Sequence, residues 1–393
     1  MSDANVVIVA ARRTPIGSFQ GELSRVTSQQ LGSTAIRQAV ADAGIAPEQI
    51  SEVLMGCVLP AGLGQAPARQ AALAAGIPDS VGCTTINKVC GSGMKTAMFG
   101  FDLLRAGGAD VIVAGGMESM SNAPYLLPKA RKGYRMGHNQ VLDHMFFDGL
   151  QNPSDGNMMG HFAEETVQKY GFTREEQDAF AKASVQRSRE AIESGAFDDE
   201  IVPVTVRVRR KDKIIERDEE PFNLEVDKIP ELKPAFRKDG TVTAASSSGI
   251  SDGAAALVLM REDEARARGL APLARIVGHA SYAGAPEWFT TAPAGAVNRL
   301  FERTGWQAGD VDLYEINEAF ACVALAAMRD LGLDHARVNV NGGSCALGHP
   351  IGATGARLIV TLTHALRRRG LGRGVATLCI GGGESTAIAI EVL

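Results

Sequence analysis

Hydrophobic positions along the chain form short apolar runs that alternate with helix-type patterns. Runs rich in Val, Ile, Leu and Ala predict strands at 6–10, 53–55, 111–114, 254–260, 273–278, 311–316 and 374–380. Apolar residues spaced by three and four predict helices at 30–43, 67–76, 294–304, 318–331 and 353–369. This alternation predicts an α/β protein with a largely parallel sheet that helices cover on both faces.

The segment 121–248 interrupts the alternation. Residues 121–160 are irregular and rich in Pro, Asn, Met and His, and they precede a helix from Thr173 to about Gly195 and an exposed strand at 202–208. We interpret 121–248 as an inserted loop domain. It separates an N-terminal half, 1–120 completed by about 249–270, from a C-terminal half at 271–393.

Two outer segments resemble each other in sequence. Residues 112–119 read IVAGGMES and residues 378–385 read LCIGGGES, and each follows a helix of similar length. The order of the surrounding elements also matches, so we favour an internal duplication over chance similarity of two glycine turns.

A thiol lies in the stretch 87–96, NKVCGSGMKT, between a β-type segment at 84–86 and a helix-type pattern. The apolar face of that helix comprises Met94, Ala97, Met98, Phe101 and Leu104. Cys90 is therefore expected where a strand turns into a helix, and the helix N-terminus favours a thiolate there. The neighbouring glycines allow a substrate to approach the backbone closely.

Three further polar residues are predicted at the carboxyl ends of strands, the edge where open α/β sheets bind ligands. Asn317 follows the strand at 311–316, His349 lies in a glycine-rich loop, and Cys379 ends the strand at 374–380. Asn317 has an alternative interpretation as a helix cap. We interpret the other four cysteines as buried apolar residues and the other six histidines as ordinary hydrogen-bonded residues.

Composition excludes several classes of function. The chain has 393 residues and a formal net charge of −5, which argues against a general nucleic-acid binder. Its six cysteines are scattered without a CxxC pair, so we expect no structural metal site and a reducing compartment, by default the cytoplasm. The apolar run at 6–11 is too short for a signal peptide, and no run is long enough to span a bilayer.

Together, these stretches resemble those of the thiolases over essentially the whole chain, and within that family those of the acetyl-CoA acetyltransferases. The motifs that carry the resemblance are NKVCGSGMK, NEAFA, GGSCALGHPIGATGAR and CIGGGES, with GTVTAASSSGISDGAA at 240–255 beside them. The resemblance implies the thiolase fold: two similar βαβαβαββ-type halves in a layered αβαβα arrangement, with an inserted loop domain that binds CoA.

The resemblance also implies the chemistry, a reversible Claisen condensation of two acetyl-CoA to acetoacetyl-CoA and CoA through an acetyl-cysteine. Cys90 would be the nucleophile that His349 activates, and Cys379 the general acid/base. His349 and a water held by Asn317 would form one oxyanion hole. The backbone N–H groups of Cys90 and Gly381 would form the other.

The expected substrate-contacting residues match the family less completely than the catalytic residues do. Met159, Ala244 and Ser248 match positions that contact CoA in relatives, and Phe320 matches a residue near the pantetheine. Met158 stands where many biosynthetic relatives carry His, and 217–228 has no obvious match for the arginine that often meets the adenine. Phe289 has two interpretations: it shortens the acyl pocket and so favours acetyl groups, or it only packs the loop that contains it.

Rival functions remain open. A degradative 3-ketoacyl-CoA thiolase of broader chain length would use the same residues. Cys379 argues against a ketoacyl synthase, and a non-catalytic acyl-CoA or lipid-binding relative should have lost a catalytic residue.

We expect a role in fatty acid metabolism, CoA as substrate and product with no tightly bound cofactor, and no nucleic-acid or membrane partner. Residues 130–142 resemble the loop that joins tetrameric members, which predicts a homotetramer, a dimer of dimers.

Overall fold

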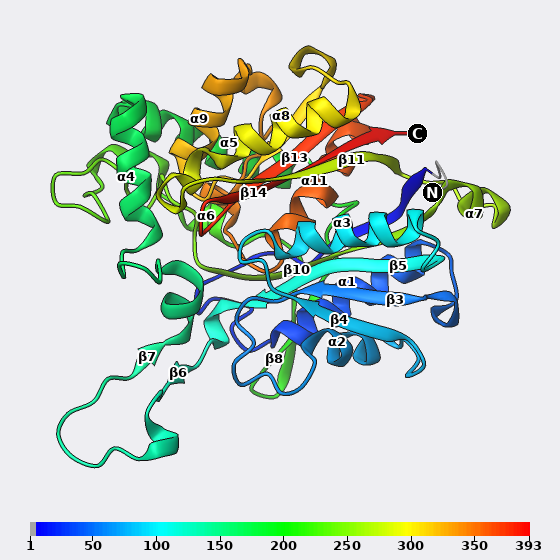
Figure 1. Cartoon of the computed structure of the whole chain (residues 1–393), viewed down its shortest axis with the longest axis horizontal. Helices are drawn as coiled ribbons and strands as arrows, with labels where there is room; N and C mark the ends of the chain where they lie inside the picture. Colours follow the sequence, from blue (N-terminus) through cyan, green and yellow to red (C-terminus); the bar gives the residue numbers. More distant parts are fainter. Residues whose placement is uncertain (1–4) are drawn as a thin grey trace.

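A ten-stranded mixed sheet runs through a computed structural model of the protein (Figure 1), and the structure describes residues 5–393. Five strands of the first half lie in the order β4-β3-β5-β10-β1. They are β1 (Val6–Arg13), β3 (Glu52–Gly56), β4 (Gly82–Ile86), β5 (Val111–Ser119) and β10 (Ser251–Arg261), and the short β2 (Gly17–Ser18) pairs with β10.

The second half repeats this order. Its strands run β12-β13-β14-β11, and an isolated parallel bridge from Tyr314 to Val338 occupies the place that β4 has in the first half. They are β11 (Ala274–Ala283), β12 (Leu313–Ile316), β13 (Arg373–Ile380) and β14 (Glu384–Val392). Parallel and antiparallel pairings also correspond strand by strand, which agrees with the predicted pair of similar halves.

The prediction of a largely parallel sheet is wrong. Between the named strands of the sheet, parallel pairing is limited to β3–β4, β3–β5 and β12–β13, whereas every strand pair that contains β1, β10, β11 or β14 is antiparallel. The reason is that β1 pairs with β10 and β11, two strands that lie far from β1 in the sequence, while β13 and β14 form a hairpin that turns at residues 381–383. Strand β14 was missing from the prediction.

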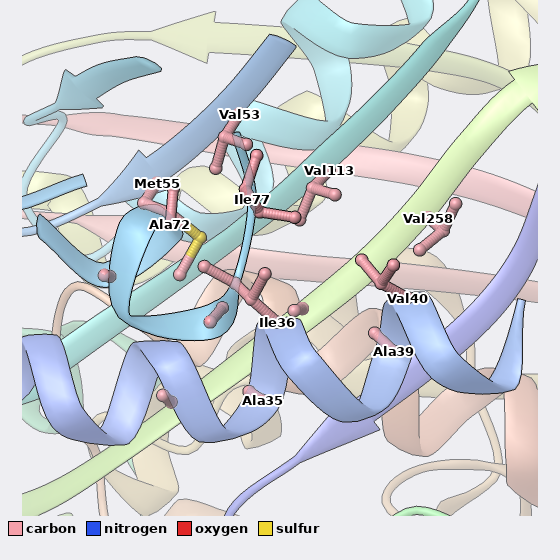
Figure 2. Packing of buried hydrophobic residues seen from close by; sticks show 14 of the residues in the cluster. Ala35, Ile36, Ala39, Val40, Val53, Met55, Ala72, Ile77, Val113 and Val258 are labelled. Atoms are coloured by element: carbon pink, nitrogen blue, oxygen red, sulfur yellow. The ribbon is translucent and has the colours of Figure 1, made fainter. Parts of the chain in front are cut away.

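Helices on the outer face of the first half form one layer. Helices α1 (Ser28–Asp42) and α2 (Pro67–Ala75) pack there, and Ile36 and Val40 of α1 meet Val53, Val113 and Val258 of the sheet (Figure 2). Alternate residues of β1 face opposite ways, as expected for a strand covered on both sides.

A central helical layer joins the two halves. Helices α3 (Ser92–Arg105) and α11 (Thr354–Arg369) pack against each other and against strands of both halves. All five apolar positions predicted for the face of α3 are buried in this cluster. Helices α8 (Ala292–Thr304) and α9 (Ala321–Leu331) cover the far face of the second half, which completes the αβαβα layers.

Between β5 and β10 the chain forms smaller elements outside the sheet (Figure 1). They are β6 (Tyr125–Leu126), β7 (Leu142–Asp143), a π-helical segment (Met145–Leu150), α4 (Met159–Tyr170), α5 (Arg174–Glu193), β8 (Val204–Val208), β9 (Lys211–Ile215) and α6 (Glu220–Asn223). Three other short helices are α7 (Glu262–Ala267), α10 (Ser344–Leu347) and the 3-10 turn Pro286–Thr291. Neither α4 nor the π-helical segment was predicted, and the loop between β6 and β7 projects from the molecule (Figure 1).

Buried ion pairs connect the segment 121–248 to the first half. Arg13 contacts Glu200 through Nε at 2.5 Å and Asp218 through both terminal nitrogens, and all three side chains are buried. The division at 120 and 248 stays a prediction, and residues 1–4 of its first unit lie outside the described residues. No helix within residues 5–393 is long and apolar enough to cross a membrane.

Candidate active site

Cys90 lies in a tight turn between β4 and α3, as the sequence predicts. The residue before it, Val89, has a φ of +46°, a left-handed conformation that is rare for a β-branched side chain. Hydrogen bonds hold the turn: the Val89 N–H donates to Asn87 Oδ1 at 2.9 Å, and the Lys88 N–H donates to Ser92 Oγ at 2.8 Å. The strained turn fixes where the thiol points.

The hairpin that follows Cys379 packs against this turn. The backbone N–H of Gly381 interacts with the Cys90 sulfur, and Lys88 forms an ion pair with Glu384. A Cβ at Gly91 would lie 2.4 Å from Cδ1 of Ile380, so no side chain fits between the two turns. The structure thus brings the two predicted cysteines to one place.

His349 is buried and has one ring nitrogen engaged. Its Nδ1 lies 2.6 Å from Thr354 Oγ1, whose own hydrogen is donated to the Pro350 carbonyl at 2.9 Å. Nδ1 must therefore carry the proton in this bond, which leaves a lone pair on Nε2. Within residues 5–393 Nε2 has no hydrogen-bond partner. Burial, and then the charge of Arg357, lower the pKa of His349 to about 3, so the ring is neutral.

Asn317 is fully buried directly after β12. Its N–H donates to the Thr377 carbonyl, and its Oδ1 accepts from Ser344 Oγ at 2.6 Å. Its Nδ2 has no partner in the described part of the chain. The alternative interpretation as a helix cap is wrong, because α9 begins at Ala321 with Phe320 at the N-cap.

Glu118 connects the His349 loop to the first half. Its buried carboxylate accepts from the N–H groups of Val58, Leu59 and Gly352 at 2.9, 3.2 and 2.9 Å. Burial raises the pKa of Glu118 to about 7, although those three N–H groups act in the opposite direction. This carboxylate holds the loop that carries His349 beside the strand of Glu118.

An apolar pocket of about 190 Å³ opens beside His349. One wall, with Met120 and Ile351, belongs to the apolar cluster that packs on Cys90; the opposite wall, with Met159 and Phe320, belongs to the cluster that contains Cys379. The remaining lining residues are Phe146, Leu150, Met158, Gly160, Phe236, Ser247, Ser248, Gly249, Ile250 and Ala319. A pocket of this kind suits a short acyl group and the arm that carries it.

Comparison with known proteins identifies the family. Residues 6–263 match the thiolase N-terminal domain and residues 270–392 match the thiolase C-terminal domain. The chain belongs to the thiolase family. It is 50% identical to an acetyl-CoA acetyltransferase of Pseudomonas aeruginosa over 98% of this chain and 99% of that protein. It is 51% identical to an acetyl-CoA acetyltransferase of Escherichia coli over 99% of each.

Solved thiolase structures share the fold. An acetyl-CoA acetyltransferase from Bacillus anthracis superposes with a TM-score of 0.97 at 46% identity, covering 100% of both chains. A thiolase from Ascaris suum in complex with coenzyme A gives 0.94 at 43% identity, covering 99% of this chain and 100% of that one. These likenesses confirm the predicted thiolase fold.

Three of the five expected substrate-binding residues of this thiolase line the pocket: Met159, Ser248 and Phe320. The other two do not. Ala244 is exposed away from the lining, and Phe289 is buried against Phe162 in the cluster of Cys379, with ring centroids 6.4 Å apart. Among residues 5–393 no group of three or more His, Cys, Asp or Glu could hold a metal ion.

Both thiols are neutral in this thiolase. Burial raises the pKa of Cys90 to about 11, while the N–H groups of Gly381 and Cys90 lower it in part. Burial also raises the pKa of Cys379 well above its ordinary value, and Cys90 adds to the effect. The expectation that the helix terminus favours a Cys90 thiolate is therefore outweighed by desolvation.

The sequence analysis missed the residues that orient the site. Thr354 fixes the His349 ring, Ser344 contacts Asn317, and Glu118 anchors the loop. A usable signal existed for Glu118, because the pair Glu-Ser recurs at 118–119 and 384–385 in the two similar stretches. The glutamate is buried only in the first copy. Ser344 and Thr354 lie in a predicted motif but gave no pattern of their own.

Proposed function

We propose that this thiolase is an acetyl-CoA C-acetyltransferase, which condenses two acetyl-CoA to acetoacetyl-CoA and CoA in a reversible reaction. The observation that carries the proposal is the packing of the Cys90 turn against the Cys379 hairpin, next to two apolar clusters whose residues line the pocket of His349. The full-length identity to acetyl-CoA acetyltransferases supports the same substrate.

In the acylation step, Cys90 Sγ attacks the thioester carbonyl of acetyl-CoA. His349 Nε2 accepts the thiol proton, which its free lone pair permits, and returns it to the departing CoA thiolate. One thioester replaces another, so the exchange has little energetic cost. The N–H groups of Cys90 and Gly381 stabilise the charge on the carbonyl oxygen.

In the condensation step, Cys379 passes its proton to His349 Nε2 and, as a thiolate, removes a proton from the methyl group of a second acetyl-CoA. His349 and a water held by Asn317 stabilise the enolate oxygen. The methylene carbon then attacks acetyl-Cys90, acetoacetyl-CoA forms, and the released Cys90 thiolate takes the proton held by His349. Each thiol is restored to its starting form.

CoA is proposed to bind over the pocket as substrate and product. Met159, Ser248 and Phe320 would contact its pantetheine arm because they line the apolar entrance to His349. Exposed Ala244 would lie at the outer rim, on the 121–248 segment that we propose as the CoA-binding domain. The coenzyme A complex of the Ascaris suum thiolase supports this mode of use.

A chain-length series tests the substrate. Thiolysis of acetoacetyl-CoA should exceed that of 3-ketohexanoyl-CoA in kcat/KM, since the pocket is small and Phe289 fills space beside Cys379. Faster turnover of the longer thioester would favour the degradative 3-ketoacyl-CoA thiolase instead. Absence of any thiolysis would favour a non-catalytic acyl-CoA or lipid-binding relative.

The cellular location, the metabolic role and the oligomeric state are part of the same proposal. A cytoplasmic enzyme of fatty acid metabolism suits a mechanism that needs Cys90 and Cys379 as free thiols, and all six cysteines are free. The exposed loop at 130–142 supports a homotetramer, because it presents Met136 and Tyr134 away from the body of the protein.

A further inference from the structure

A buried chain of polar side chains leads from β12, in the second half of the sheet, to Asn317. Glu315 of β12 contacts Arg357 Nη1 of α11 at 3.4 Å, and Arg357 Nη2 donates to Ser344 Oγ at 3.0 Å. Ser344 Oγ in turn donates to Asn317 Oδ1 at 2.6 Å. All four side chains are at most 2% exposed.

The direction of the hydrogen bonds along these four side chains follows from the donors and acceptors that each group has. A guanidinium has donors and no acceptor, so Ser344 Oγ must accept from Arg357. The single hydroxyl hydrogen of Ser344 goes to Asn317 Oδ1. If Nδ2 faced Ser344 instead, Oγ would accept from both Arg357 and Asn317, and its own hydrogen would be left without an acceptor within residues 5–393, so the facing atom is the oxygen. Without that contact, either end of the amide could face Ser344, because the two orientations have nearly the same shape.

The geometry points to Ser344 as a positioning residue: with Arg357 behind it, it fixes the Asn317 amide so that Nδ2 is the atom left as a donor for the reaction. This inference rests on the proposed function, in which Asn317 Nδ2 holds the water of the enolate oxyanion hole. The unpartnered, buried Nδ2 is the second observation that supports it.

The backbone of Ser344 does not depend on its hydroxyl. Glu318 Oε2 accepts from the N–H of the next residue, Cys345, at 3.0 Å, and from Ser184 Oγ at 2.7 Å. Glu318 Oε1 accepts from Asn339 Nδ2 at 2.8 Å. These bonds hold α10 in place, so removal of the hydroxyl should leave the fold intact. It releases the amide and also removes the acceptor of Arg357 Nη2.

A double-mutant cycle tests the inference, with thiolysis of acetoacetyl-CoA by CoA as the assay. Ser344→Ala should lower kcat by about tenfold and change KM by less than about twofold, since the bound water is disturbed and the pocket is not. In an Asn317→Ala background, where the amide is already gone, Ser344→Ala should have less than about a twofold further effect.

Ser188→Ala is the matched control. Ser188 is also fully buried and lies against Gly342 of the same loop, but its hydroxyl has no partner within residues 5–393. It should leave kcat unchanged. If Ser344→Ala does not fold, as judged by its melting curve, Ser344→Cys replaces it, because a thiol keeps the volume and is only a weak donor.

Two results would overturn the inference alone: an active wild type with unchanged kcat in the Ser344 variants, or an equal loss with and without Asn317. An inactive wild type would instead overturn the proposed function, and the inference with it.

Discussion

At the scale of single residues, the two cysteines have different tasks although they lie in one site. Cys90→Ala should abolish acyl-enzyme formation, because the nucleophile is gone. Cys379→Ala should still become acetylated but should lose condensation by several orders of magnitude, since no base remains for the methyl proton. Intact-protein mass spectrometry after incubation with labelled acetyl-CoA measures the first step, and release of acetoacetyl-CoA measures the second.

Cys322→Ala is the control for this pair. Cys322 is a buried cysteine in the same apolar cluster as Cys379, where its thiol donates to the Ala163 carbonyl at 3.7 Å. The Cys322→Ala protein should keep both acetylation and condensation. Label on the Cys90→Ala protein would refute the assignment of the nucleophile.

The acidity of Cys90 gives a second prediction at this scale. With its pKa at about 11, the free thiol is neutral near pH 7, and the thiolate fraction grows about tenfold for each pH unit as pH rises. The rate of Cys90 alkylation by iodoacetamide should therefore rise steadily from pH 7 to 10 without a plateau. Peptide mass spectrometry follows this residue separately from the other cysteines.

The same protein unfolded in urea provides the reference for that experiment. There the burial is gone, so the Cys90 rate should level off near the ordinary thiol pKa of about 8.5. A plateau near pH 8 in the folded protein would mean that the helix terminus outweighs desolvation.

At the scale of elements, the β13–β14 hairpin carries the site and depends on two left-handed glycines. Gly382 has φ of +95° with open space around it, whereas a Cβ on Gly383, at φ +89°, would lie 2.5 Å from the Gly284 carbonyl oxygen. Gly382→Ala should cost about 1 kcal/mol of unfolding free energy through backbone strain alone. Gly383→Ala should cost about 2 kcal/mol more, because the backbone of 284–285 must also move.

Urea denaturation of the two variants measures this difference. Each variant is the control for the other, since both replace a left-handed glycine of one turn. Gly383→Ala should also lower kcat, because the shift reaches the N–H of Gly381 beside Cys90. Equal stabilities for the two would show that the contact with Gly284 is not tight.

The elements also show what a single sequence can predict. Long periodic segments such as α3 and α11 were predicted correctly. The turn around Cys90 was predicted from its glycines and from the apolar face of the helix that follows it. Strand β14 was missed because it begins with the polar residues Glu384, Ser385 and Thr386, which leaves an apolar run of only four residues at 387–390. The π-helical segment lacked any periodic pattern.

At the scale of the whole molecule, non-local pairing limited the prediction. The antiparallel partners of β1 are about 250 residues away, and no local pattern fixes which strands become neighbours. The meeting of Cys90 with the Cys379 hairpin followed from the duplication, which places equivalent turns of two halves together. The hydrogen bonds of Ser344 and Thr354 depend on angles and distances that residue types alone do not contain.

Assembly is the last property at this scale. The loop at 130–142 projects from the body (Figure 1), and Met136 on it is 92% exposed. Single exposed apolar side chains are common, but here Tyr134 and Val141 are exposed on the same projection.

If this loop joins two dimers, Met136→Asp should convert a tetramer into dimers, because a charge would be desolvated at the contact. Sedimentation velocity measures the change, and kcat should stay within about twofold since the loop is remote from Cys90.

Ile214→Asp is the matched control for that experiment. Ile214 is 63% exposed on β9, an apolar side chain on another projecting hairpin, and its replacement should leave the tetramer intact. A wild type that sediments as a stable monomer would contradict the homotetramer directly. A tetramer that survives Met136→Asp would show that another surface joins the dimers, because an aspartate in the contact would be desolvated without a partner.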